Sequence, residues 1–150
     1  MENKTKVYLF LFALLVLQTA GPTTAHSEST GKLIVNISGF PSSDGVAMIA
    51  LHNSEQSYQG EEAGALDKKI VPVVNQETQV VFENLAFGSY GVALYHDENT
   101  NGKLDTNAMG IPKEAYGFSN NARGFFGKPS YKDVIFQMNS EEKQISINIE

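Results

Sequence analysis

Residues 84–92 read NLAFGSYGV, and this stretch decides the fold class. The four residues Leu85–Gly88 predict a tight turn, because glycine adopts backbone conformations that other residues avoid. The segments on either side, Gln79–Glu83 and Ser89–His96, have the apolar and aromatic composition of β-strands. The stretch therefore predicts two strands that are joined at a sharp corner.

Apolar and polar residues alternate in much of the chain from Gly31 onward. Apolar side chains recur at every second position in Leu33–Ile37 and again in Ile145–Ile149, which is the period of a half-buried strand. Five further strands are predicted near Val46–His52, Lys69–Val74, Gln79–Glu83, Ser89–His96 and Lys132–Met138. Seven short strands separated by turn signals favour an all-β, antiparallel two-sheet sandwich of immunoglobulin-like or transthyretin-like type over a barrel.

Local signals refine this arrangement at three places. Pro72 has no N–H to donate to a neighbouring strand, so its strand is expected at the edge of a sheet. Asn75 and Gln76 are predicted to form the turn of a hairpin. Only the segment Ser54–Leu66 is a candidate for a short helix.

The first 25 residues have the three-part pattern of a secretory signal peptide. Lys4 and Lys6 precede an unbroken apolar run of eleven residues, Val7–Leu17, and small residues at Thr23–Ala25 offer a cleavage point. A membrane-spanning helix needs about 20 apolar residues, so we expect cleavage after Ala25 and no stable membrane anchor, with an uncleaved anchor as the alternative. A short linker, 26–30, then leads into a single domain, 31–150, located in the periplasm or outside the cell.

Composition limits the partners of this domain. The chain contains no Cys, which excludes disulfides and attachment to lipid through a cysteine. Its formal net charge of −6 becomes −7 when Glu2, Lys4 and Lys6 leave with the leader. An acidic domain disfavours nucleic acid and anionic lipid surfaces, because both require clustered Lys and Arg.

Residues 97–105, DENTNGKLD, predict a calcium site. The first, third, fifth and ninth positions carry side-chain oxygens, and Gly102 at the sixth permits the turn that brings in the carbonyl of Lys103. The predicted ligands are Asp97, Asn99, Asn101, Lys103 and Asp105. Ala108 stands where an EF-hand has its last Glu, so we expect weak affinity, with a Kd of roughly 10⁻⁴–10⁻³ M. The alternative is a polar turn without a metal.

Several residues near this loop are candidates to support it or to bind a second metal. His96 is expected to orient Asp97, and Glu114 is expected to fix the loop from outside the ligand shell. His52 and His96 end two strands in similar contexts, so together with Asp97 they are also candidates for a zinc site. The alternative for each histidine is a hydrogen bond to a backbone carbonyl or a loop carboxylate.

The 25 residues Thr106–Ser130 show no strand pattern, yet they are too rich in aromatic residues to be disordered. We expect an ordered excursion over one end of the sandwich, next to the calcium loop. It would form either a binding surface or a plug that closes the end of the core. The candidate surface comprises Tyr116, Phe118, Asn120, Asn121, Arg123, Phe125 and Phe126.

Two resemblances extend this interpretation. Residues 84–92 resemble the N-L-x-x-G-x-Y-x-V corner of transthyretin-like and related secreted modules, which implies that Tyr90 packs at the corner of the sandwich. The linked motifs HDENTNGKLD at 96–105, GIPKEAYGFSNN at 110–121 and GKP at 127–129 resemble the bacterial DUF2141 family of exported proteins. This resemblance implies export and an all-β sandwich, with no assigned activity and no catalytic residues to carry over.

Two classes of function follow from these observations. The first is an exported, noncatalytic module with a calcium-binding loop that binds a glycan or an envelope or extracellular protein. The alternative is a metal-dependent hydrolase that uses the Asp97–Asp105 loop or the His52 and His96 pair. The sequence has no G-x-S-x-G elbow, Gly-rich phosphate loop or cysteine nucleophile, which excludes the commonest enzyme templates.

Overall fold

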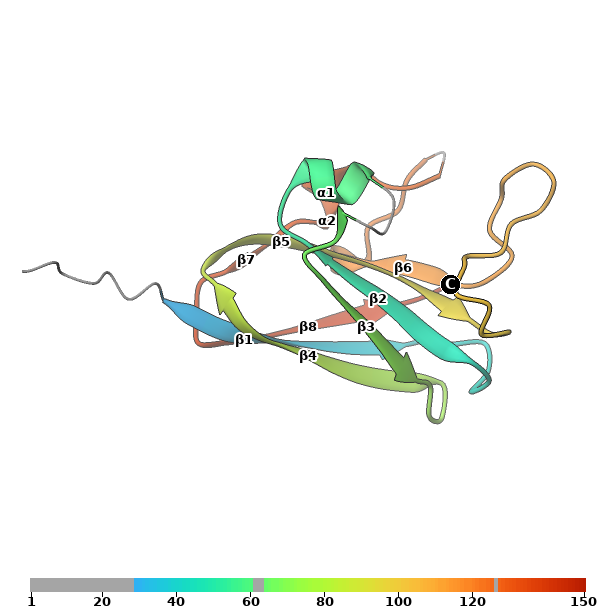
Figure 1. The fold of residues 1–150 in the computed structure, drawn as a ribbon, viewed down its shortest axis with the longest axis horizontal. Helices are drawn as coiled ribbons and strands as arrows, with labels where there is room; N and C mark the ends of the chain where they lie inside the picture. Colours follow the sequence, from blue (N-terminus) through green and yellow to red (C-terminus); the bar gives the residue numbers. More distant parts are fainter. Residues whose placement is uncertain (1–28, 61–63, 126) are drawn as a thin grey trace, which may run out of the picture.

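Eight strands in two sheets make up most of the protein (Figure 1). The computed structural model describes residues 29–60, 64–125 and 127–150, so the predicted signal peptide lies outside the described residues. The strands are β1 (Thr30–Ser38), β2 (Val46–His52), β3 (Asp67–Pro72), β4 (Glu77–Ala86), β5 (Gly88–Asp97), β6 (Tyr116–Phe118), β7 (Phe136–Met138) and β8 (Glu142–Asn148). Short helical segments are α1 (Glu55–Gln59), η2 (Ser119–Asn121) and α2 (Tyr131–Val134).

The first sheet has the strand order β4-β1-β8, and the second has the order β3-β2-β5-β6, with β7 also paired to β5. The all-β sandwich predicted from the sequence is therefore confirmed. One pair departs from the predicted antiparallel pattern, because β1 and β8 run parallel from Lys32 opposite Glu142 to Ser38 opposite Asn148. These strands lie at opposite ends of the described chain, so the intervening strands form the crossover that a parallel pair requires.

The core lies between the facing surfaces of the two sheets. Leu33, Val35 and Ile37 on β1 are at most 1 % exposed, as their alternation predicts. The second sheet contributes Ala47, Ile49, Leu51, Val92 and Leu94 to the same cluster. Each fully buried Leu, Ile or Val contributes about 1.5–3 kcal/mol, so this cluster is the main source of stability.

The predicted corner joins the two sheets. The chain leaves the first sheet at Ala86 and enters the second at Gly88, with only Phe87 between. The hydroxyl of Tyr90 donates to the carbonyl oxygen of Ala86 at 2.8 Å, and the ring of Tyr90 packs in the main core. Tyr90 therefore fixes the turn from both sides, as its resemblance to a sandwich corner implies.

The predicted edge strand and turn are also found. Pro72 ends β3, which is an edge strand. Asn75 and Gln76 have φ angles of 53° and 62°, and Val74 and Glu77 pair across them. The turn connects the two sheets, because β3 and β4 continue into different ones.

The prediction of a strand over Lys132–Met138 is wrong in its first half. Residues Tyr131–Val134 form α2, and only Phe136–Met138 is a strand. One helical turn brings Tyr131 and Val134 to the same side, where both pack against Phe118 and its neighbours. The helix expected within Ser54–Leu66 is present as the shorter α1, capped by the Ser54 hydroxyl, which accepts from the backbone N–H of Ser57.

The helices and the long loop after β5 lie on the same side of the second sheet, away from the first sheet (Figure 1). Tyr58 of α1 and Phe118 of β6 belong to a second, smaller cluster of buried residues on this side. No helix among the described residues has the length and apolar character needed to cross a membrane. Loops and helices thus border the outer face of the second sheet.

Candidate functional site

Asp97 is the last residue of β5, and its side chain is 1 % exposed. Its two carboxylate oxygens accept hydrogen bonds from the backbone N–H groups of Asn101 (3.0 Å) and Gly102 (2.8 Å). A carboxylate that receives two backbone donors fixes the turn that follows it. Asp97 therefore organises the loop that begins after it.

The tip of the 97–105 loop is closed by its own amide side chains. The Oδ1 atoms of Asn99 and Asn101 each accept from the N–H group two residues further along, at 3.0 and 2.8 Å. Their Nδ2 groups donate to the two carboxylate oxygens of Asp105, at 2.8 and 3.2 Å. Gly102 has a φ of 76°, in the left-handed region that favours glycine. The side chains predicted at positions three, five and nine do converge.

Glu114 holds the two ends of the loop together from outside it. Its Oε1 accepts from the N–H of Glu98 at 3.1 Å, and its Oε2 accepts from the N–H of Asp105 at 2.8 Å. The side chain is only 9 % exposed. Glu114 thus supports the loop from outside, as predicted, and it does so by accepting from backbone N–H groups.

The charge around this loop is strongly negative. Asp97, Asp105 and Glu114 accept only N–H groups, and within the described residues no Lys or Arg lies within ion-pair distance of them. The described residues contain no cluster of three or more His, Cys, Asp or Glu side chains able to hold a metal. A metal in this loop would therefore depend on amide and backbone oxygens as well as on carboxylates.

His96 does not contact Asp97. Neighbouring residues of a strand face opposite sides, so His96 lies in the interior, fully buried, where its Nε2 donates to the carbonyl oxygen of Asp44 at 2.6 Å. Its Nδ1 lies 3.4 Å from Glu98 Oε1 without forming a hydrogen bond. The role of orienting Asp97 falls to the backbone donors of the loop instead.

The predicted pair of His52 and His96 is wrong as a metal site. His52 pairs with Gly91 and His96 pairs with Ala47, so five residues of β2, roughly 16 Å, separate the two positions. The two side chains also project from opposite faces of the sheet, because their pairing positions differ in parity. One zinc ion cannot reach both histidines.

The polar members of the predicted binding surface bond to the protein itself. Asn120 donates through Nδ2 to two backbone carbonyls at α2, at 2.9 and 3.1 Å. The Oδ1 of Asn121 accepts from the N–H of Asn148, and Arg123 donates to the carbonyl oxygen of Asn148 and pairs with Glu150 at 3.3 Å. These three side chains tie the segment to β8 and α2.

The aromatic members separate into different environments. Phe118 is buried beside Tyr58. Tyr116 lies two residues earlier on β6, and its ring centroid is 5.9 Å from that of Phe118. Phe125 is 94 % exposed, so the expectation that it plugs the core is wrong. Phe126 lies outside the described residues. Among the described aromatic members, only Tyr116 and Phe118 face a common cavity.

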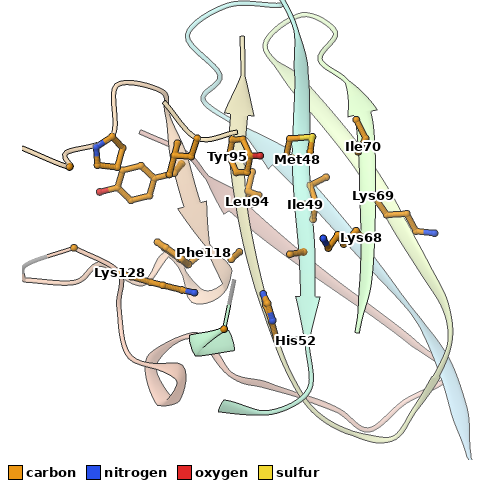
Figure 2. A pocket seen from close by; sticks show the side chains of 18 residues that line it. Met48, Ile49, His52, Lys68, Lys69, Ile70, Leu94, Tyr95, Phe118 and Lys128 are labelled. Atoms are coloured by element: carbon orange, nitrogen blue, oxygen red, sulfur yellow. The ribbon is translucent and has the colours of Figure 1, made fainter. Parts of the chain in front are cut away.

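That cavity lies on the outer face of the second sheet and was not predicted from the sequence (Figure 2). We call it the trough. It has a volume of about 470 Å³. Its floor and walls are formed by side chains of β3, β2, β5 and β6, by Leu104 and Pro112 of the long loop, and by Lys128. One signal for it was present in the sequence: residues 90–95, YGVALY, are apolar without interruption, which is typical of a strand buried on both faces.

Comparison with known proteins gives one match. A family model described as "Uncharacterized protein conserved in bacteria (DUF2141)" matches residues 35–146, which run from β1 into β8. No curated protein and no solved structure matches the chain. The description of the family assigns no activity.

Proposed function

Because the chain belongs to the DUF2141 family of uncharacterized bacterial proteins, we propose its function from its own residues. We propose an exported, noncatalytic β-sandwich module that binds calcium through the 97–105 loop. Its partner would be a glycan or protein of the envelope or the extracellular space. The pattern of the first 25 residues supports export.

The observation that carries the calcium proposal is the uncompensated charge at the loop. Asp97 and Glu114 are buried, Asp105 is half-buried, and among the described residues none of them is paired with Lys or Arg. Buried carboxylates ordinarily have a cationic or metal partner. A divalent cation would supply the missing positive charge.

The arrangement of oxygens also supports a hard cation. Asp105 already lies within 2.8–3.2 Å of the side-chain amides of Asn99 and Asn101. Calcium accepts six to eight oxygen ligands in flexible geometry, including neutral amide and backbone oxygens. Binding would exchange the two N–H bonds to Asp105 for contacts between the ion and the oxygens of both amides, with the Lys103 carbonyl adding a further ligand.

Thermal unfolding of the purified protein in calcium and in chelator tests this proposal. A ligand that binds only the folded state stabilises it by about 1.4 kcal/mol when its free concentration is tenfold above Kd. We expect this shift at millimolar calcium and a smaller shift with magnesium, which requires a tighter octahedral shell. Asp105→Asn should remove the shift. Asp67→Asn, a change on β3 outside the loop, should leave it intact.

Identical unfolding curves in calcium and in chelator would rule out the calcium site. A calcium shift that survives in Asp105→Asn would place the ion elsewhere in the protein.

A further inference from the structure

We propose that the trough binds a medium-chain fatty acid, with its carboxylate beside His52 and Lys128 and its acyl chain along the outer faces of β2 and β5. This site does not use the calcium ligands, and the proposal does not depend on calcium binding. The following observations support it.

The floor of the trough consists of two rows of side chains that cross the sheet. In the first row, Ile70, Met48, Tyr95 and Tyr116 lie opposite one another on β3, β2, β5 and β6. In the second row, the order is Lys68, Ala50, Ala93 and Phe118. The outward-facing positions of a sandwich sheet are ordinarily polar. Here seven of these eight side chains are apolar or aromatic, so this face favours contact with an apolar ligand.

Small residues create the hollow. Ala50 and Ala93 lie side by side in the middle of the second row, between the larger Lys68 and Phe118. Leu104 and Pro112 from the long loop add apolar walls. The resulting volume of about 470 Å³ lies within the range of pockets that hold one small ligand.

One end of the trough carries positive charge. Lys128 lies with its Nζ 3.7 Å from the centre of the Tyr58 ring and donates to the backbone carbonyl of Tyr58. No Asp or Glu among the described residues forms an ion pair with it. Among the described residues, the Tyr58 carbonyl is the one hydrogen-bond acceptor of this ammonium group, which has three N–H donors. Burial lowers the pKa of Lys128, as expected for an ammonium group that is partly withdrawn from water.

His52 stands at the same end (Figure 2). It is 3 % exposed, and its Nδ1 lies 3.4 Å from the hydroxyl oxygen of Ser57. Its pKa is lowered by burial first, then by the positive charge of Lys128, and also by that of Lys68. Lys128 and His52 therefore lie at the same end of the trough, where a carboxylate would meet the positive charge of Lys128.

Charge complementarity selects an anion with an apolar tail. The protein has a net charge of −6, yet no Asp or Glu is found among the described residues that line the trough, and Lys128 and His52 stand at one end of it. From His52 to Met48 the trough extends over four residues of β2, roughly 13 Å. An extended acyl chain can follow this apolar path from the basic end toward Leu104. A glycan would leave most of this apolar surface without suitable contacts.

Calorimetric titration with decanoate, decanol and acetate tests the proposal, both in calcium and in chelator. We expect decanoate to bind, decanol to bind more weakly because it lacks the charge, and acetate not to bind because it lacks the tail. Lys128→Met keeps the apolar stem and removes the charge, so decanoate affinity should fall roughly tenfold or more while decanol affinity stays the same. Lys143→Met, on β8 of the other sheet, is the matched control and should change neither.

Ala50→Leu fills the hollow and should abolish binding of decanoate and decanol alike, with thermal unfolding measured in parallel to confirm that the variant folds. If Ala50→Leu does not fold, the Lys128→Met comparison decides alone. The proposal fails if decanoate does not bind, if acetate binds as well as decanoate, or if Lys128→Met and Lys143→Met give the same affinity. Because each titration is repeated in chelator, these outcomes are separate from failure of the calcium site.

Discussion

Replacing Glu114 by Gln is the sharpest test of how the 97–105 loop is held. The carboxylate accepts from the N–H groups of Glu98 and Asp105, which lie at the two ends of the loop. An amide of the same shape keeps one oxygen acceptor and turns an NH₂ group toward the second backbone donor. Two donors then face each other at a site that is 9 % exposed.

The size of the effect follows from this change. A hydrogen bond to a charged group contributes about 1.5–3 kcal/mol, and one such bond is lost outright. We therefore expect Glu114→Gln to lower the free energy of unfolding by about 1.5–3 kcal/mol. At roughly 4 °C per kcal/mol for a domain of this size, the melting temperature should fall by about 6–12 °C.

Urea denaturation of the parent and two variants measures this effect, because the midpoint and the slope together give the free energy of unfolding. The control is Glu98→Gln, which changes a side chain that is 43 % exposed but leaves its backbone N–H bonded to Glu114. The control should stay within about 0.5 kcal/mol of the parent. Equal losses in the two variants would show that Glu114 does not hold the loop.

Three further outcomes follow from particular residues. Gly102→Val and Gly110→Val should each cost about 1–3 kcal/mol in thermal unfolding, because both positions have a positive φ (76° and 77°); only Gly102→Val should also remove the stabilisation by calcium. Tyr90→Phe should lower the free energy of unfolding in urea by about 0.5–1.5 kcal/mol, whereas Tyr131→Phe should not, because the buried Tyr131 hydroxyl has no hydrogen-bond partner among the described residues. His52 has a pKa below 6.5, so the folded protein binds fewer protons than the unfolded chain and stability should fall as the pH drops below 6.5; stability measured against pH should show a smaller decrease in His52→Gln.

The strands with one buried face could be predicted from the sequence. Leu33, Val35 and Ile37 alternate with half-buried residues, and this pattern fixes both the strand and its inward face. The corner at Gly88 and Tyr90 could also be predicted, because the turn and the aromatic residue that packs against it are close together in the sequence. Such signals are local, and no knowledge of the pairing partners is needed to use them.

The pattern of buried residues at every second position was misleading at 134–138, because a helical turn followed by a short strand produces the same pattern. Val134, Phe136 and Met138 are all buried, so the alternation that predicted a strand is real. Val134 nevertheless belongs to a helical turn, because Tyr131 must reach the same cluster and residues three apart share a side only in a helix. Tertiary packing, which the sequence pattern does not contain, decides between the two.

The candidate site was predictable in the loop itself and in the supporting role of Glu114, but not in the contacts by which Glu114 acts. The spacing of Asp97, Asn99, Asn101 and Asp105 places their side chains together, as found. The clamp by Glu114 depends on a return of the chain, in which Lys113 donates its N–H to the carbonyl oxygen of Asp105 at 2.8 Å. The trough depends on the register of four strands, which no single segment specifies. Contacts between segments that are distant in the chain could not be predicted from the sequence.

The loop and the trough share a structural element, and this links the two proposals. Asp97 lies on the same outer face of β5 as Tyr95 and Ala93, so the loop opens where the trough ends. Leu104 belongs to the loop and also lines the trough. If an ion in the loop and a fatty acid in the trough both favour the same placement of Leu104, each must raise the affinity for the other by the same factor, because binding free energies are reciprocal. Unequal factors cannot occur at equilibrium, and a factor of one in both directions would show that the two sites are not coupled through Leu104.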